Sequence, residues 1–262
     1  MGIMKKLVIA RRFSQAFFLL LFLGILWPFA HPLERFLSSR IFSRTDPLVM
    51  IFSSISQRAV LQGMVFSFIM LLATLVLGRF FCGWICPLGT AIDWTGALRK
   101  KKTFLNSRAA GGMRAVKFYI LGLVAVFSLF GVQASTILDP LGIMARFIFL
   151  TLAPALEMGI YYLMESGAVL LLFVLICFSA LFISRFWCRA VCPLGALYAL
   201  VAKFSLLERK ITKCDSCGTC VGNCRMGAIK EDAGYIKEEC ILCMDCVYDC
   251  PRNATKFTWV SF

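Results

Sequence analysis

Four long apolar runs without charged residues constrain this chain more than any other feature of its sequence. Each is close to the roughly 20 residues that a helix needs to cross the hydrocarbon core of a bilayer. The chain is 60% hydrophobic and only 16% charged, against about 25% charged in a typical soluble protein. We therefore expect a mainly α fold with four transmembrane helices, which lie between Arg12 and His31, Arg58 and Arg79, Lys117 and Asp139, and Glu165 and Arg185.

The first run resembles a signal peptide, but the segment Trp27–His31 offers no convincing cleavage site and three more runs follow. We therefore expect an uncleaved first helix. Two further apolar stretches, Pro47–Gln57 and Phe147–Leu156, are too short to span a membrane. We expect them to form interfacial or re-entrant helices on the outer side.

The net charge of +14 comes almost entirely from Lys and Arg residues that border the apolar runs. This pattern is typical of membrane topology signals and argues against a nucleic-acid-binding protein. Basic residues are frequent before the first run and in the middle loop, whereas the loop between the third and fourth runs has only Arg146. Both termini are therefore predicted in the cytoplasm, against the contrary signal of Arg35, Arg40, Arg44 and Arg58.

The membrane part contains an internal repeat, with halves at about residues 11–98 and 114–202. Each half has Asp-Pro-Leu before its second apolar run, at Asp46 and Asp139, and a Cys-x3-Cys-Pro-Leu-Gly segment after it. Halves of equal topology are related by a pseudo-twofold axis along the membrane normal. That axis would bring the two Cys-x3-Cys-Pro segments face to face at the cytoplasmic end of the bundle.

The C-terminal part, residues 203–262, contains two runs of four cysteines with the spacing x2, x2, x3. In two-cluster ferredoxins of this spacing, the fourth cysteine of each run binds the other cluster. We expect a small α+β domain with two [4Fe–4S] clusters rather than zinc sites or disulfides. The predicted ligands are Cys214, Cys217, Cys220 and Cys250 for the first cluster and Cys240, Cys243, Cys246 and Cys224 for the second. Arg225 stands where such a run usually has Pro, and we expect it to alter local rigidity and redox potential.

The twin motifs of the membrane domain, residues 1–202, supply four more thiols: Cys82, Cys86, Cys188 and Cys192. Cysteines four residues apart share one face of a helix, so two such pairs offer the ligands of a third iron–sulfur cluster. Arg79, Arg185 and Arg189 are expected nearby, where they would offset negative charge. The alternatives are packing residues or redox-active thiols. Cys177, in the fourth run, is expected to be a core residue.

At these residues the chain resembles the NapH family of ferredoxin-type membrane proteins, within a wider group of NosR-like and CcoG-like proteins. It differs from NosR in lacking a large N-terminal flavin-bearing domain and from CcoG in ending soon after the ferredoxin motif. The resemblance implies a quinol dehydrogenase component of the cell inner membrane. Such a component passes electrons between the quinone pool, as menaquinone or ubiquinone, and an iron–sulfur or haem subunit of a respiratory complex.

A quinone site needs proton acceptors beside an apolar slot. The candidates at the outer side are His31, Glu34, Asp46 and Asp139, with Gln15 and Gln133 as weaker ones. For the two Asp-Pro pairs we favour a helix-capping role, because Asp before Pro is a common helix start. The lone His31 excludes bis-histidine haem ligation by this chain.

Three functions remain open from the sequence. The first is an electron-transfer subunit with three clusters, and the second is an assembly or maintenance factor that reduces a metal or thiol in another protein. The third is a transporter, which the apolar run interiors disfavour because no ionisable residue lies in them. A Gly-rich nucleotide fingerprint is missing from the sequence, so direct NADH oxidation is not expected.

Overall fold

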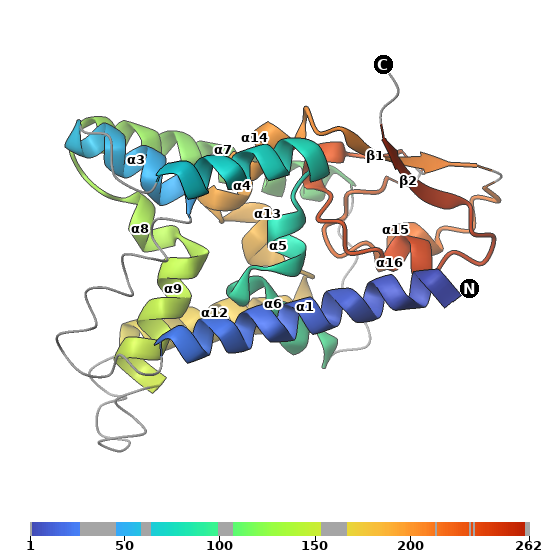
Figure 1. The fold of residues 1–262 in the computed structure, drawn as a ribbon, viewed down its shortest axis with the longest axis horizontal. Coiled ribbons are helices and arrows are strands. Elements are labelled where there is room, and N and C mark those ends of the chain that lie inside the picture. The colour runs from blue at the N-terminus through green and yellow to red at the C-terminus, as the bar shows by residue number, and fades with distance from the viewer. Residues whose placement is uncertain are drawn as a thin grey trace.

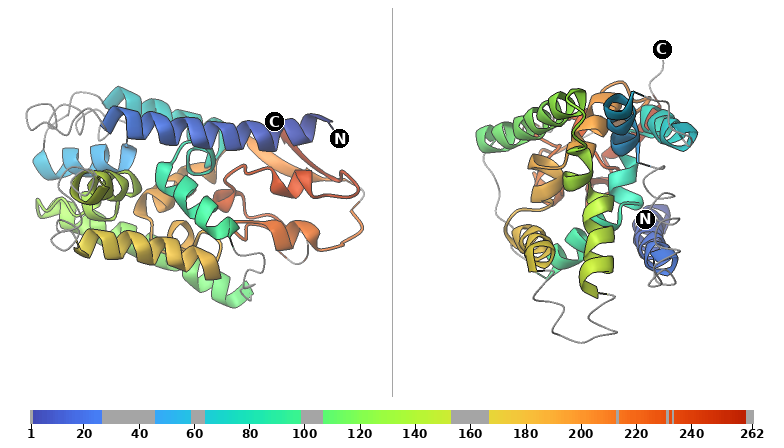
Figure 2. Two further views of the ribbon diagram at one scale, coloured as in Figure 1. Left: turned by 90° about the horizontal axis from the view of Figure 1, so that it is seen from below. Right: turned by 90° about the vertical axis from the view of Figure 1, so that its left-hand side faces the viewer.

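The computed structural model describes residues 2–26, 46–58, 64–98, 107–152, 167–212, 214–230, 232 and 234–259. The described chain is mainly helical (Figure 1). Its longer helices lie along the long axis of the molecule, and the cysteine-rich C-terminal part, with its two strands, occupies one end. The N-terminus lies at that same end, beside this C-terminal part (Figure 2).

Within the described ranges, two helices are long and apolar enough to cross a membrane. They are the segments Lys6–Leu26 of α1 (Gly2–Leu26) and Gly111–Leu129 of α7 (Ser107–Leu129). Most of each segment faces outward, since only 28% of the first and 22% of the second is buried. The helices in the second and fourth apolar runs, α4 (Met64–Leu77) and α12 (Gly167–Phe182), are apolar but shorter, with 14 and 16 residues.

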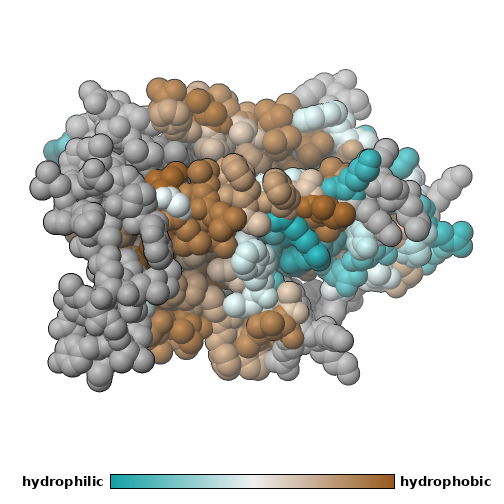
Figure 3. Space-filling model, turned by 60° about the horizontal axis from the view of Figure 1, so that its bottom comes forward, coloured by the Kyte–Doolittle hydropathy of each residue, from teal (hydrophilic) through white to brown (hydrophobic). Residues whose placement is uncertain are grey.

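Apolar side chains cover the middle of the molecule. In Figure 3 a brown surface extends over the helical part, and the hydrophilic residues gather toward the end that holds the C-terminal strands. Exposed apolar side chains come from several helices, among them Phe13, Phe66, Phe68, Leu123 and Leu171. A contiguous exposed apolar surface of this kind is typical of contact with lipid or another protein.

Short helices fill the space between the long ones: α3 (Pro47–Gln57), α8 (Ser135–Leu138), α9 (Pro140–Phe147) and a π-helical turn (Ile148–Leu152). The predicted short helix Pro47–Gln57 is present. One side of it is buried, and it packs against α4 and α7. The other predicted short helix, Phe147–Leu156, was wrong in its bounds. Phe147 ends α9, the π-turn follows, and the residues after 152 lie outside the described ranges.

Each Cys-x3-Cys-Pro segment forms a short helix, a break and a second helix. The pairs are α5 (Phe80–Trp84) with α6 (Pro87–Ala97), and α13 (Phe186–Ala190) with α14 (Pro193–Ala202). The break arises because proline has no N–H to continue the first helix, whereas its fixed φ suits the first position of the next. The second cysteine of each motif is therefore the N-cap of the second helix.

The C-terminal part contains an antiparallel pair of strands, β1 (Leu207–Ile211) and β2 (Thr255–Trp259), in which Arg209 pairs with Phe257. Between them lie α15 (Thr219–Asn223), a 3-10 turn (Lys237–Glu239) and α16 (Asp245–Tyr248). One hydrophobic core runs through both parts of the chain. It joins Leu88 and Leu194 of the helical part to Met226, Ile241 and Cys243 of the C-terminal part.

Candidate iron–sulfur sites

Twelve of the thirteen cysteines line three separate pockets, four to each pocket. The distal pocket is lined by Cys214, Cys217, Cys220 and Cys250. Cys214 and Cys217 are exposed, so this pocket lies at the surface of the C-terminal part. The four residues are the set that the doubled spacing predicts for one cluster, and their role as ligands stays a prediction.

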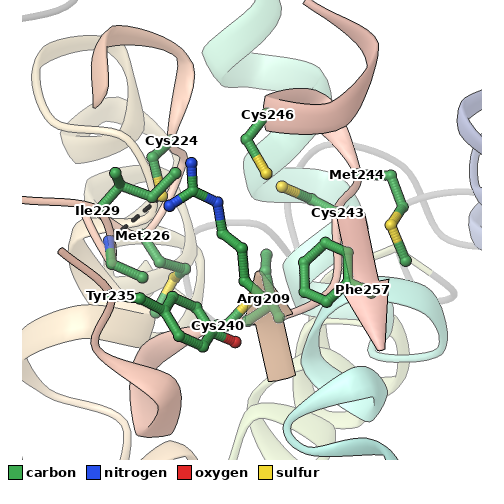
Figure 4. Close-up of a pocket in the computed structure, with 12 residues that line it drawn as sticks. Arg209, Cys224, Met226, Ile229, Tyr235, Cys240, Cys243, Met244, Cys246 and Phe257 are labelled. Atoms are coloured by element: carbon green, nitrogen blue, oxygen red, sulfur yellow. Dashed lines mark hydrogen bonds between the residues drawn. The ribbon is translucent and has the colours of Figure 1, made fainter. Parts of the chain in front are cut away.

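The proximal pocket, shown in Figure 4, is lined by Cys224, Cys240, Cys243 and Cys246. It contains the one cysteine of the first run that the sequence assigned to the second cluster, Cys224. The side chain of Arg209 extends from β1 between Cys224 and Cys246. Its Nη2 also lies 3.5 Å from the sulfur of Cys220, a distal-pocket residue, so one guanidinium borders both cysteine sets.

The membrane pocket is lined by Cys82, Cys86, Cys188 and Cys192, together with Leu88, Leu194 and Pro140. All four cysteines are buried. The two Cys-x3-Cys-Pro segments thus meet around one pocket, as the repeat predicts. Cys177 lies in α12 and is not among the residues that line the three pockets.

Backbone N–H groups point at one or more sulfurs of every pocket. In the membrane pocket, Gly89 N donates to Cys86 Sγ at 3.5 Å and Gly195 N to Cys192 Sγ at 3.3 Å. The N–H of Ala228 donates to Cys224 Sγ, the dashed line in Figure 4, and that of Ala254 to Cys250 Sγ, both at 3.2 Å. Such donors stabilise thiolates over thiols.

The donor set fits clusters better than single ions. Among the described residues, no three His, Cys, Asp or Glu side chains come together as ligands of one metal ion. The cysteines instead surround cavities in sets of four, which is the ligand set of a [4Fe–4S] cluster.

Arginines stand beside the membrane pocket as expected, with one exception. Arg185 donates to the carbonyl of Cys82 at 2.6 Å, and the Arg79 guanidinium lies close to Gly195. Arg189 was wrongly expected beside the same pocket. Its guanidinium instead approaches Gly227 of the C-terminal part, because the α13 helix turns this position away from the twin motifs.

A buried ionic network centred on Asp93 joins the two parts of the chain. The Asp93 carboxylate accepts hydrogen bonds from Arg11 at 2.5 Å and Arg185 at 2.7 Å, and Arg225 lies 3.3 Å away. Arg225 also contacts Asp245 at 2.5 Å. Burial raises the pKa of Asp93, but the three guanidinium groups outweigh burial and hold it well below its usual range.

A second network is centred on Glu239 in the C-terminal part. Its carboxylate contacts Arg79 at 2.8 Å and also Lys117 of α7. Arg79 and Lys117 are fully buried in the structure. Burial raises the pKa of Glu239, but the two cations outweigh this and lower it.

The membrane pocket and the proximal pocket are connected by direct packing. A Cβ atom added to Gly83, next to Cys82, would lie 2.2 Å from the carbonyl oxygen of Ile241. The indole Nε1 of Trp84 donates to the carbonyl of Leu242 at 3.0 Å. The loop between Cys240 and Cys243 therefore packs directly against α5, which contains Cys82. The two cysteine sets are thus joined by direct contacts between these segments.

The structure places the candidate quinone residues in different surroundings. Asp46 and Asp139 are the N-caps of α3 and α9, as the capping interpretation predicts, and both are buried. His31 and Glu34 lie outside the described residues. Gln15 is buried, and its amide donates to Asp93 at 3.0 Å in the network that joins the C-terminal part. Gln133 is exposed in the connection between α7 and α8.

A protein-family model for 4Fe–4S binding domains matches residues 60–104 and 166–214. The two matched segments contain the twin Cys-x3-Cys-Pro motifs. The ferredoxin-type protein NapH of Escherichia coli is 29% identical over 96% of this chain and 88% of its own length. This chain is a relative of the NapH-type ferredoxin proteins.

Two other relatives extend this comparison. An uncharacterized protein of Methanocaldococcus jannaschii is 28% identical over 98% of both chains. The putative electron transport protein YccM of Escherichia coli is 27% identical over 70% of this chain and 51% of its own length. No solved structure matches this relative of NapH.

The Asp93 and Glu239 networks were missed from the sequence. Asp93 gave one signal, because it is the one acidic residue between Asp46 and Asp139, in a segment otherwise rich in Lys and Arg. A lone carboxylate there needs a buried partner or solvent. Its partners lie at residues 11, 185 and 225, and no local spacing could identify them.

Proposed function

We propose that this chain is a membrane-bound electron-transfer subunit, with an iron–sulfur cluster in each of the three four-cysteine pockets. The observation that carries the proposal is the membrane pocket, where four buried cysteines from two distant segments meet. The 4Fe–4S family model covers both of these segments. The clusters would supply one-electron chemistry, and the chain would supply the thiolates, the N–H donors and the neighbouring cations.

The order of the pockets supports a relay. The distal pocket is exposed, the proximal pocket is partly buried, and the membrane pocket is buried in the helical part. Arg209 borders the distal and proximal cysteine sets, and Gly83 against Ile241 joins the proximal and membrane sets. A soluble redox partner would therefore exchange electrons at the distal pocket.

The other end of the relay would be the quinone pool. This part of the proposal rests on the relation to NapH and on the apolar helices. The N-terminus and the C-terminal part share one end of the molecule (Figure 2), and the distribution of Lys and Arg would place that end in the cytoplasm. The quinone would bind on the outer side, near His31 and Glu34, with Asp46 and Asp139 as internal proton acceptors.

Iron and acid-labile sulfide per protein, after anaerobic purification, test the three-pocket arrangement. Three [4Fe–4S] clusters give about 12 irons and two give about 8. We expect about 12 in the wild type and a loss of one cluster in a Cys82→Ser/Cys188→Ser variant. Cys177→Ser is the matched control, because it also removes a thiol from the helical part but from none of the pockets.

An iron content of about 8 atoms per protein in both the wild type and the double variant would contradict the proposal. The twin motifs would then be redox thiols or packing residues, and an assembly factor would become the better description. Reduction of the clusters by a quinol analogue in membranes tests the quinone end separately. Clusters that dithionite reduces but the quinol does not would remove the quinone from the proposal.

A further inference from the structure

Asp46 and Asp139 come from the two halves of the chain and meet inside the protein. Only 1% of Asp46 and 2% of Asp139 are exposed. Each carboxyl group uses one oxygen as a helix cap. Asp46 Oδ1 accepts from Leu48 N at 2.8 Å and Asp139 Oδ2 accepts from Gly142 N at 2.6 Å. Capping therefore accounts for one oxygen of each carboxyl group, and the second oxygen of each has no part in the cap.

The other two oxygens, Asp46 Oδ2 and Asp139 Oδ1, receive no N–H or O–H donor from the described residues. The two side chains lie within hydrogen-bond distance of each other. Two carboxylates cannot donate to one another, and two like charges in an apolar interior repel strongly. The contact is stable when one carboxyl carries a proton that both share, as in paired aspartates elsewhere.

The pair is next to the membrane pocket. Pro140, the residue after Asp139, lines that pocket together with its four cysteines. Tyr198 lies close enough to interact electrostatically with Asp46, Asp139, Cys82 and Cys86. Its ring packs on Phe81, its hydroxyl is fully buried, and the described residues offer that hydroxyl no hydrogen-bond partner. Another buried polar group without a partner among the described residues thus lies near both the carboxyl pair and the cysteines.

The other titratable groups on the helices around Asp46 and Asp139 have partners other than these two carboxyl groups or lie in solvent. Helices α4, α7, α8 and α14 pack on α3, and α6, α8, α12 and the π-turn pack on α9. Among their described side chains, α4, α8 and the π-turn have no titratable group, and α14 has Tyr198. The others contact different partners or solvent: Arg114, Lys117, Tyr119, Asp93, Cys177 and, on α9 itself, Arg146.

We propose that Asp46 and Asp139 form a proton-binding site whose occupancy changes with electron transfer at the membrane pocket. An added electron there places a negative charge beside a carboxyl pair that holds one proton and one negative charge. The pair then binds a second proton, and it releases that proton when the electron leaves. The reductant is the proximal cluster of the proposed function, on which this inference rests.

Redox titrations followed by electron paramagnetic resonance at several pH values test the inference. The signal of the membrane pocket is the one that disappears in Cys82→Ser/Cys188→Ser. In the wild type its midpoint potential should fall by about 59 mV per pH unit, which is a tenfold change per unit for a one-electron couple. The signals of the two other clusters serve as an internal reference, because no carboxyl group is among the described residues that line their pockets.

The variants are Asp46→Asn, Asp139→Asn and the double variant. Asparagine is as good an N-cap as aspartate, so α3 and α9 keep their starts while the proton site is lost. We expect the pH slope of the membrane-pocket signal to fall to near zero in each variant, with the iron content unchanged. Redox-difference infrared spectra should lose a protonated carboxyl C=O band in the same variants.

An unchanged slope in the double variant, or a flat slope in the wild type, would overturn the proton site while leaving the cluster relay intact. Absence of a third signal in the wild type would instead overturn the proposed function itself. If the double variant loses iron, the pH slopes of the two single variants decide whether the proton site exists, because each single variant keeps one carboxyl group and both helix caps.

Discussion

The two Cys-x3-Cys-Pro segments have nearly the same backbone but different surroundings. Cys86 and Cys192 have the same N-cap role, with φ of −59° and −64°, and each sulfur accepts from the glycine three residues later. The equivalent arginines, Arg79 and Arg185, each reach across to the opposite half. The geometry around the sulfurs is therefore repeated.

Several differences between the two segments concern contact with the C-terminal part. Arg185 pairs with Asp93 in the helical part, whereas the residue in the second half that corresponds to Asp93 is Ala199. Arg79 instead pairs with Glu239, which the C-terminal part supplies. Gly83 similarly corresponds to Arg189, and its missing side chain makes room for Ile241. The pocket keeps its symmetry, and the asymmetric residues bind the second domain.

Among these variants, Asp93→Asn should lower the stability of the protein most. It leaves Arg11, Arg185 and Arg225 near a neutral amide in a buried site, and removing one partner of a buried ion network costs about 3–5 kcal/mol. Thermal unfolding in detergent should show the loss. Because the pKa of Asp93 is lowered in the folded protein, its stabilisation is fully present above about pH 4, the unfolded pKa. It is lost as the pH falls through the folded pKa, so wild type and variant should differ equally at pH 6 and pH 8.

Glu239→Gln should cost slightly less, because it leaves two buried cations rather than three without their carboxylate. The comparison predicts a rescue. Ala199→Asp places a carboxylate at the position that Asp93 has in the other half, so it should restore part of the lost thermal stability. No restoration in the Glu239→Gln/Ala199→Asp double variant would show that the two arginine environments are not equivalent.

Gly83→Ala should have an intermediate effect. Its Cβ would lie 2.2 Å from the backbone oxygen of Ile241, and backbone cannot rotate away as a side chain can. Overpacking of this kind costs about 1–3 kcal/mol. We expect faster proteolysis of the C-terminal part and a changed Trp84 fluorescence. Gly122→Ala in α7 is the control, since nothing lies within 4 Å of its added Cβ.

The smallest difference should come from the paired glycines that follow the prolines. The Cβ of Gly89→Ala would lie 2.9 Å from the backbone oxygen of Cys82, whereas that of Gly195→Ala would meet the end of the Arg79 side chain at the same distance. A side chain can shift more easily than backbone, so Gly89→Ala should lower the unfolding temperature more. We expect a difference of about 1 kcal/mol between the two variants.

Cysteine spacing predicted the two groups of four in the C-terminal part, because such a ligand set leaves a local signature in the sequence, whereas the third group was expected from the internal repeat. The caps at Asp46 and Asp139 were equally predictable, since a helix start involves neighbours in the chain. The pairing of these two aspartates was not, and neither was the Arg79–Glu239 contact, because both join residues far apart in the sequence. Such contacts depend on how the helices pack, which local patterns do not encode.

The position of Arg11 has a consequence for biogenesis. This arginine lies within the first hydrophobic helix, and its partners are Asp93 and, at 3.7 Å, Asp245. When a ribosome has made only α1, neither carboxylate exists, and burying a charged side chain without a partner is costly. Arg11 therefore gains its first carboxylate partner only once residue 93 has been translated, and its second only once residue 245 has been translated. A chain terminated before residue 93 would leave the Arg11 guanidinium without either of these carboxylates.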